Sequence, residues 1–161
     1  MRRHEAQHGF DYDRDTELRY PQQLADFLGP PHDAEGNAIP IVRSARAELS
    51  AYLSQIANDP VTPQAALWHL AAQVFDKDRA GTGEYYAGIV VIEGLARQLG
   101  APADAGRRVT RERLANAALV IAGASGAKLR AAASALWSEL YGEPVTPIVD
   151  APARGVLATA T

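Results

Sequence analysis

The stretch ARAELSAYLSQIAND, residues 45–59, decides the fold that the sequence predicts. Its larger apolar side chains recur three and four positions apart, which places them on one face of a helix. Pro60 follows at once, and a residue that precedes proline disfavours the helical conformation. We therefore expect a buried helix from Val42 to Asn58. The residues expected on its inner face are Ala45, Leu49, Tyr52, Leu53 and Ile56.

Helical spacing recurs on both sides of this stretch, and residues that break helices separate the segments. The run GPPHDAEGNAIP, residues 29–40, is the longest such interruption and predicts a loop. No alternating pattern typical of a strand appears, so the sequence predicts an all-α bundle of about six or seven helices. The other expected helices cover the N-terminal motif and fade near Asp13–Asp15, then span 24–28, 63–74, 82–100, 110–121 and 125–141.

Two glycines, Gly88 and Gly94, lie inside the expected helix over residues 82–100. Glycine in a helix interior costs stability, and its use there suggests close packing against a neighbouring helix. After Gly142 the sequence is rich in Pro, Ala and Thr without a sustained period. We therefore expect one helical domain over residues 1–142 and a poorly ordered tail over residues 143–161.

Composition narrows the classes of function. The chain has 161 residues, a net charge of −3 and 47% hydrophobic residues, values typical of a globular protein. It has no cysteine, so disulfides and thiolate metal sites are excluded. No basic stripe interleaves with aromatic residues, which argues against nucleic acid as a partner. No signal peptide or apolar run long enough to span a membrane is apparent, and the compartment stays open.

Residues 4–8 read His4-Glu5-Ala6-Gln7-His8, which fits the H-E-x-x-H pattern. On a helix, residues four apart lie one above the other, so the two imidazoles can bind one metal ion. The Glu beside the first histidine then reaches a water on that metal and acts as its general base. The pattern predicts a zinc site with His4 and His8 as ligands and Glu5 as the catalytic base. The alternative is two surface histidines and a solvated glutamate on an ordinary helix.

A catalytic zinc site normally has three protein ligands and one open position. Glu48 is the best candidate for the third ligand, because it lies among small and apolar residues of the expected helix over residues 42–58. A buried carboxylate is costly without a partner, and a metal would provide one. The alternative is that Glu48 is a rim residue paired with Arg43 or Arg46.

Other residues are candidates for supporting roles. Asp11 is expected to orient His8 through the free ring nitrogen of the histidine. Tyr52, Tyr20 and His69 are candidate donors to the oxyanion of a hydrolysed carbonyl, and the sequence does not choose among them. His32, in the loop, could reach a metal only if that loop folded over the site.

The combination of HEAQHGFDYDRD, ELRYPQQLADF and ARAELSAYLSQIAND resembles the gluzincin branch of the zincin metallopeptidases, in particular poorly characterised bacterial members. The resemblance covers residues 3 to about 59, which would form the active-site part, with residues 60–142 as supporting helices. It implies a zinc-dependent peptidase that acts on a peptide or protein substrate. His4, His8 and Glu48 would be the zinc ligands, with Glu5 as the base.

Zincins resemble one another in having a substrate-binding strand upstream of the active-site helix. Here only Met1-Arg2-Arg3 precede His4, so we expect a truncated chain, completed by a missing N-terminal segment or by a partner subunit. The alternative function is a catalytically inactive helical binding or scaffold module derived from a zincin. Two features support this alternative function: the missing segment, and the apolar helices expected over residues 82–141, which could present a surface to a partner.

Overall fold

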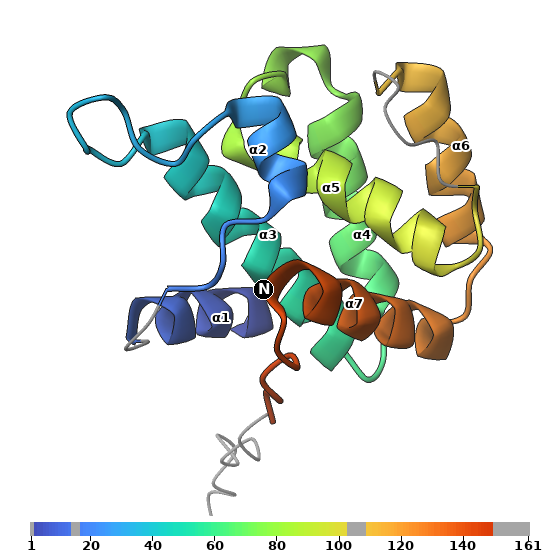
Figure 1. Ribbon diagram of the computed structural model, residues 1–161. Helices are drawn as coiled ribbons and strands as arrows, with labels where there is room; N and C mark the ends of the chain where they lie inside the picture. Colours follow the sequence, from blue (N-terminus) through green and yellow to red (C-terminus); the bar gives the residue numbers. More distant parts are fainter. Residues whose placement is uncertain (1, 14–16, 103–108, 150–161) are drawn as a thin grey trace, which may run out of the picture.

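The computed structural model describes residues 2–13, 17–102 and 109–149, and it is all-α (Figure 1). Within these ranges the chain forms seven α-helices, one short 3₁₀ helix over Lys77–Arg79 and no strand. The predicted all-α class is therefore confirmed. The α-helices are α1 (Arg2–Asp13), α2 (Gln22–Leu28), α3 (Pro40–Asn58), α4 (Pro63–Phe75), α5 (Gly83–Gln98), α6 (Arg111–Ala122) and α7 (Gly126–Tyr141).

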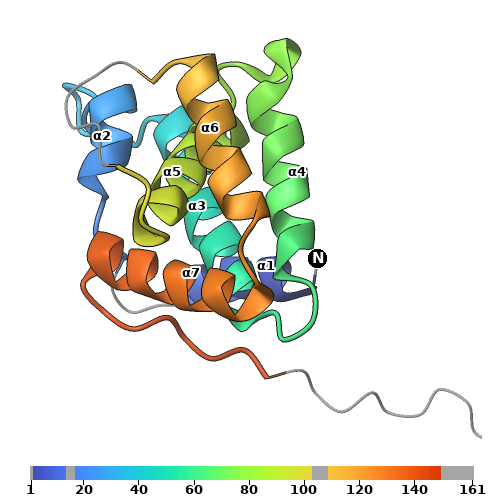
Figure 2. The ribbon, with the colours of Figure 1, turned by 90° about the vertical axis from the view of Figure 1, so that its right-hand side faces the viewer.

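Helix α3 forms the centre of the bundle, as its apolar spacing predicts. It contacts α1, α2, α4, α5 and α7, and the views of Figures 1 and 2 show these helices around it. Leu49, Leu53 and Ile56 are completely buried and join the core with residues of α5 and α7. Because α3 contacts so many other helices, a side chain on any of its faces meets a different neighbour.

Polar side chains cap the N-termini of several helices. The Thr82 hydroxyl accepts a hydrogen bond from the backbone N–H of Tyr85 and thereby caps α5. Thr110 and Ser125 cap α6 and α7 in the same way. Such a cap satisfies a backbone N–H that has no partner within the helix.

Helix α4 begins differently from this pattern. Pro63 is its first residue, but the Thr62 side chain makes no capping hydrogen bond. Instead the Asp59 carboxylate accepts hydrogen bonds from the backbone N–H groups of Val61 and Thr62. Partial burial raises the pKa of Asp59, but these hydrogen bonds outweigh it and hold the pKa below the ordinary value. Asp59 therefore stabilises the turn between α3 and α4 as an ionised group.

Gly88 and Gly94, inside α5, do allow close packing, as expected. A Cβ atom added to Gly88 would overlap the Val74 side chain of α4, and one added to Gly94 would overlap Leu136 of α7. Leu136 is 1% exposed, so it has little room to move aside. The glycines therefore set how closely α4 and α7 approach α5.

We expect Gly94→Val to lower the free energy of unfolding by about 2 kcal/mol, because overpacking a filled core forces side chains and backbone to shift. Gly9→Val is the matched control, since Gly9 also lies inside a helix but has no atom within 4 Å of an added Cβ. The control should change stability by less than about 0.5 kcal/mol. Urea unfolding followed by circular dichroism measures both. Equal stability of the two variants would contradict the close α5–α7 contact.

Some boundaries differ from the sequence-based expectation. Helix α3 begins at Pro40, two residues earlier than expected, because proline is well suited to the first position of a helix. The loop before α3 carries an isolated bridge between His32 and Ala38. Residues 143–149 follow α7 and form neither helix nor strand. Two parts of the predictions lie outside the described ranges: residues 14–16, at the expected end of the first helix, and residues 150–161 of the expected tail. None of the described helices is long and apolar enough to cross a membrane.

Candidate metal centre

Helix α1 lies against α3 and brings both motif histidines to Glu48. The Nε2 atoms of His4 and His8 are 3.2 Å apart, as their spacing of four residues on one helix predicts. Glu48 of α3 faces this pair, with its Oε2 atom 3.3 Å from His4 Nε2 and its Oε1 atom 3.9 Å from His8 Nε2. Two helices therefore bring two imidazole nitrogens and one carboxylate to a common point.

The geometry of this cluster fits a small divalent cation. Zinc binds nitrogen and oxygen ligands at about 2.0–2.2 Å, so neighbouring ligand atoms of a tetrahedral site lie roughly 3.3–3.5 Å apart. The distances from His4 Nε2 to His8 and to Glu48 are 3.2 and 3.3 Å. Each of the three residues offers one ligand atom, and these atoms all lie within 4.8 Å of one another. Two imidazoles and one carboxylate are also a common donor set for zinc.

Glu48 has the ionisation state that a metal ligand requires. A hydrogen bond with His4 lowers the pKa of Glu48, partial burial acts in the opposite direction, and the charges of the protonated histidines lower it further. The pKa lies below the ordinary value, so the carboxylate is charged at neutral pH. The alternative pairing with Arg46 is wrong, because Arg46 forms an ion pair with Glu17 at 3.0 Å and donates to the Leu18 carbonyl. Arg43 is exposed, and within the described part of the chain it forms no ion pair with Glu48.

Tyr52 and His69 adjoin the cluster. The Tyr52 ring lies one helical turn after Glu48 and packs edge-on against His4, with ring centroids 4.5 Å apart. On its other side it stacks against the exposed His69 of α4, at 5.9 Å. Burial, and then the negative charges of Glu48 and Glu84, raises the pKa of the Tyr52 hydroxyl far above its ordinary value. Tyr52 therefore keeps its proton and can act as a hydrogen-bond donor.

Asp11 does not take the position that the sequence suggested. Its carboxylate accepts hydrogen bonds from Gln7 Nε2 at 2.7 Å and from Ser50 Oγ at 2.5 Å. Within the described part of the chain, Asp11 forms no hydrogen bond with His8. The prediction that Asp11 orients His8 is therefore wrong. His4 Nδ1 is buried, and it has no hydrogen-bond partner among the residues described.

Gln7 and Ser50 are contacts that sequence reasoning missed. Gln7 is completely buried and Ser50 is 1% exposed, although both are polar. The available signal was that Gln7 and Asp11 are four residues apart and lie on the same side of α1 as His4 and His8. Ser50 had no such signal, because a serine on an apolar helix face is common. Together these side chains form a second polar contact between α1 and α3.

The remaining candidates lie at or away from the cluster. Glu5 is exposed in the first turn of α1, where its carboxylate is free to contact a bound molecule. The Tyr20 hydroxyl donates to the Gly29 carbonyl, so it is engaged outside the cluster. His32 is exposed in the loop, where it pairs with Ala38 and does not join the three ligands.

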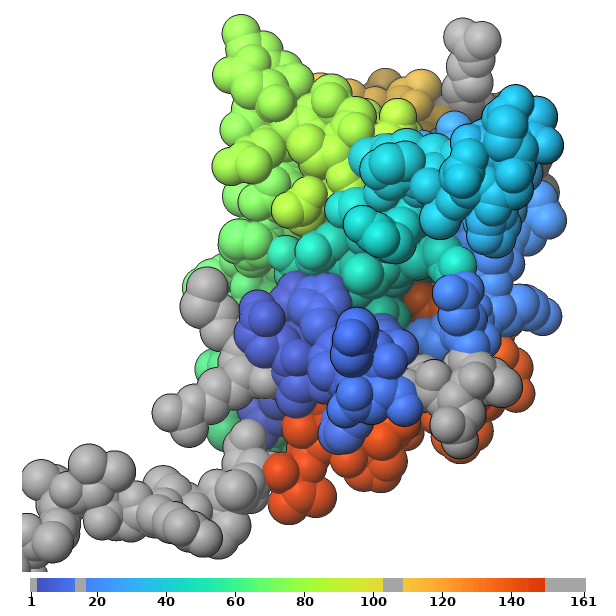
Figure 3. Space-filling view, turned by 90° about the vertical axis from the view of Figure 1, so that its left-hand side faces the viewer, coloured from blue at the N-terminus to red at the C-terminus, as the bar shows by residue number. Residues whose placement is uncertain are grey.

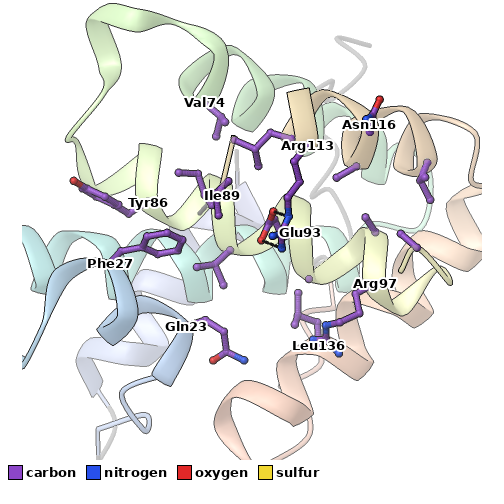
Figure 4. Close-up of a pocket in the computed structure, with 18 of the residues that line it drawn as sticks. Gln23, Phe27, Val74, Tyr86, Ile89, Glu93, Arg97, Arg113, Asn116 and Leu136 are labelled. Carbon is purple, nitrogen blue, oxygen red and sulfur yellow. Dashed lines mark hydrogen bonds and ion pairs between the residues drawn. The ribbon is translucent and has the colours of Figure 1, made fainter. Parts of the chain in front are cut away.

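A separate cleft of about 1300 Å³ lies among α2, α4, α5, α6 and α7 (Figure 4). Apolar side chains such as Phe27 and Ile89 line it, and the Glu93–Arg113 ion pair, at 2.6 Å, lies in its wall. It shares no lining residue with the His4–His8–Glu48 cluster. The cleft is therefore a second surface feature and not part of the candidate metal centre.

Comparison with known proteins finds no relative of this chain. No family model, no curated protein and no solved structure matches the chain.

Proposed function

We propose that this protein is a zinc-dependent peptidase whose metal ligands are His4, His8 and Glu48. The observation that carries the proposal is the approach of two Nε2 atoms and a Glu48 oxygen to one another at 3.2 and 3.3 Å. These residues come from α1 and α3, which 26 residues including α2 separate in the sequence, and α1 carries the H-E-x-x-H pattern.

The surrounding residues suit peptide hydrolysis. A bound zinc ion would supply Lewis acidity and lower the pKa of a coordinated water toward about 7. Glu5 follows His4 directly in the motif and would accept a proton from the attacking water, then pass it to the leaving amine. Tyr52 is protonated and packs against His4, and His69 stacks on Tyr52; these two are the candidates to donate a hydrogen bond to the developing oxyanion. Zinc and a peptide or protein substrate are therefore the proposed ligands.

The test combines metal content with hydrolysis. Protein purified without chelator should hold about one equivalent of zinc by elemental analysis, and it should cleave peptides from a fluorogenic library. Dialysis against a chelator should abolish cleavage, and added zinc should restore it. Absence of zinc, together with no zinc uptake by calorimetry, would refute the proposal. Zinc binding without cleavage of any library member would refute the peptidase activity alone.

The cleft among α2, α4, α5, α6 and α7 favours a second candidate, a helical binding module without catalysis. Its walls combine apolar side chains with charged groups such as the Arg97–Glu139 ion pair. Such a surface suits a segment of another protein. Ile89→Glu in the cleft would then abolish partner binding, whereas His8→Ala would leave that binding intact. The reverse pattern would favour the metal centre as the functional site.

A further inference from the structure

Helix α1 has no apolar anchor in the bundle. Among the α1 side chains whose burial is described, residues 3–13, only the polar Gln7 is fully buried and none belongs to the hydrophobic core. Its two large apolar side chains face solvent, since Phe10 is 43% exposed and Tyr12 is 90% exposed. In the space-filling view α1 lies on the outside of the molecule, over α3 (Figure 3). Burial of apolar surface, the main source of helix docking, is therefore nearly absent here.

The helix is also weak by itself. It has twelve residues, and isolated helices of roughly this length are marginal in water. Gly9 lies in its interior, and glycine favours the unfolded chain. Its last turn holds the acidic residues Asp11 and Asp13 and no basic residue, which opposes the helix dipole. Helix α1 must therefore be stabilised by what it contacts.

Besides Arg3, whose charge lowers the pKa of Asp59, two groups of polar contacts hold α1 on α3. One group is the hydrogen-bonded set of Gln7, Asp11 and Ser50. The other is the approach of His4 and His8 to Glu48, with the His4 ring against Tyr52. In the second group two imidazoles face each other at 3.2 Å, and only one of the two nitrogens can donate to the other. A divalent cation would give all three groups a common partner and would neutralise the Glu48 charge.

We infer that a divalent cation bound by His4, His8 and Glu48 fastens α1 to the bundle, so that α1 docks with the metal and detaches without it. This inference rests on the metal site of the proposed function but not on catalysis. The hydrophobic core is complete without α1, because its members come from α2 to α7. Loss of the metal would therefore release α1 by local unfolding and leave the rest of the bundle folded.

Release of α1 would change the surface of α3. Ser50 and the Glu48 side chain, 1% and 20% exposed in the docked state, would both meet water. Exposure of these two polar groups costs little, whereas the Tyr52 ring, 4% exposed, would lose its contact with His4. The site would also disassemble, because His4 and His8 would leave together with Glu5. Metal availability would thus decide whether the motif is assembled on the bundle.

Amide hydrogen exchange of the full chain tests this inference, with peptides covering residues 2–13 and 83–98. A ligand that binds only the docked state slows exchange through opening by a factor of 1 + [Zn]/Kd, so zinc at 100 times its Kd should slow exchange of the α1 amides about 100-fold relative to chelator. Exchange in α5 should not change. Calorimetry on the same sample gives the Kd and the stoichiometry.

Two variants make the test specific. His8→Ala should leave the α1 amides exchanging fast whether or not zinc is present. His32→Ala, which removes an exposed histidine outside the cluster, should keep the zinc-dependent protection. Ser50→Ala, which breaks the other contact group, should still allow zinc-dependent protection of α1, but to a smaller degree than in the parent chain.

Each outcome bears on the inference. Zinc-dependent protection of α1 alone supports it, even if no peptide is cleaved, in which case only the peptidase proposal fails. Equal protection of α1 in zinc and in chelator, with zinc binding shown by calorimetry, overturns the inference and leaves the peptidase proposal standing. Absence of zinc binding overturns both.

Discussion

Glu5→Gln is expected to retain zinc and to lose peptide hydrolysis by about 10²- to 10⁴-fold, the contribution of a general base. The glutamine amide has nearly the shape of the carboxylate but accepts no proton at neutral pH. Glu5 is exposed, so its replacement should leave the free energy of unfolding within about 0.5 kcal/mol. The measurements are kcat/KM on the best peptide of the library, zinc content and thermal unfolding.

Glu112→Gln is the matched control for this variant. Glu112 is an exposed acidic residue in the first turn of α6, as Glu5 is in α1, and it does not belong to the cluster. The control should hydrolyse peptides at the parent rate. If Glu5→Gln cleaved as fast as the control, Glu5 would not be the base, and zinc loss in the variant would indicate a ligand or structural role instead.

His8→Ala is expected to weaken zinc binding by more than about 100-fold, since even the loss of a group that only orients a ligand costs 10- to 100-fold. The His8 side chain is 29% exposed and its removal deletes little apolar contact, so the bundle should stay folded. Glu48→Gln removes the ligand charge from the other helix and should weaken binding in the same direction. Competition with a chromophoric chelator gives the affinities.

His32→Ala provides the comparison, because it removes one of the four histidines without touching the cluster. Its zinc affinity should equal that of the parent chain. Unchanged affinity in both His8→Ala and Glu48→Gln would mean that the metal, if bound, is held elsewhere. Far-UV circular dichroism of each variant shows whether lost binding reflects lost helix.

The elements that the sequence predicted well are those that local physics decides. The helical spacing of Leu49, Leu53 and Ile56 follows from 3.6 residues per turn, and α3 is the central helix accordingly. The caps at Thr82, Thr110 and Ser125 depend only on a hydroxyl near the next backbone N–H groups. That His4 and His8 share one face also follows from their spacing alone.

The sequence-based predictions were wrong where a side chain could form a hydrogen bond with more than one neighbour. Asp11 was expected to contact His8 on its own helix, but Ser50 of α3 and Gln7 provide its hydrogen bonds. The choice depended on how α1 is rotated and shifted along α3, which the spacing within α1 does not determine. The start of α4 is similar, since the Asp59 carboxylate, and not the neighbouring Thr62 hydroxyl, accepts the hydrogen bonds from the backbone N–H groups.

By itself, the sequence determined an all-α bundle around residues 45–56, a pair of histidines on one face of a helix and the glycines of α5, because each depends on residues within one or two turns of helix. Only the tertiary structure decided that Glu48 meets those histidines, since forty residues separate His8 from Glu48 and the contact requires α1 to lie on α3. It also decided that α1 is held mainly by polar groups, together with the packing of His4 on Tyr52. Contacts between distant segments depend on how helices pack, and packing is a property of the whole chain.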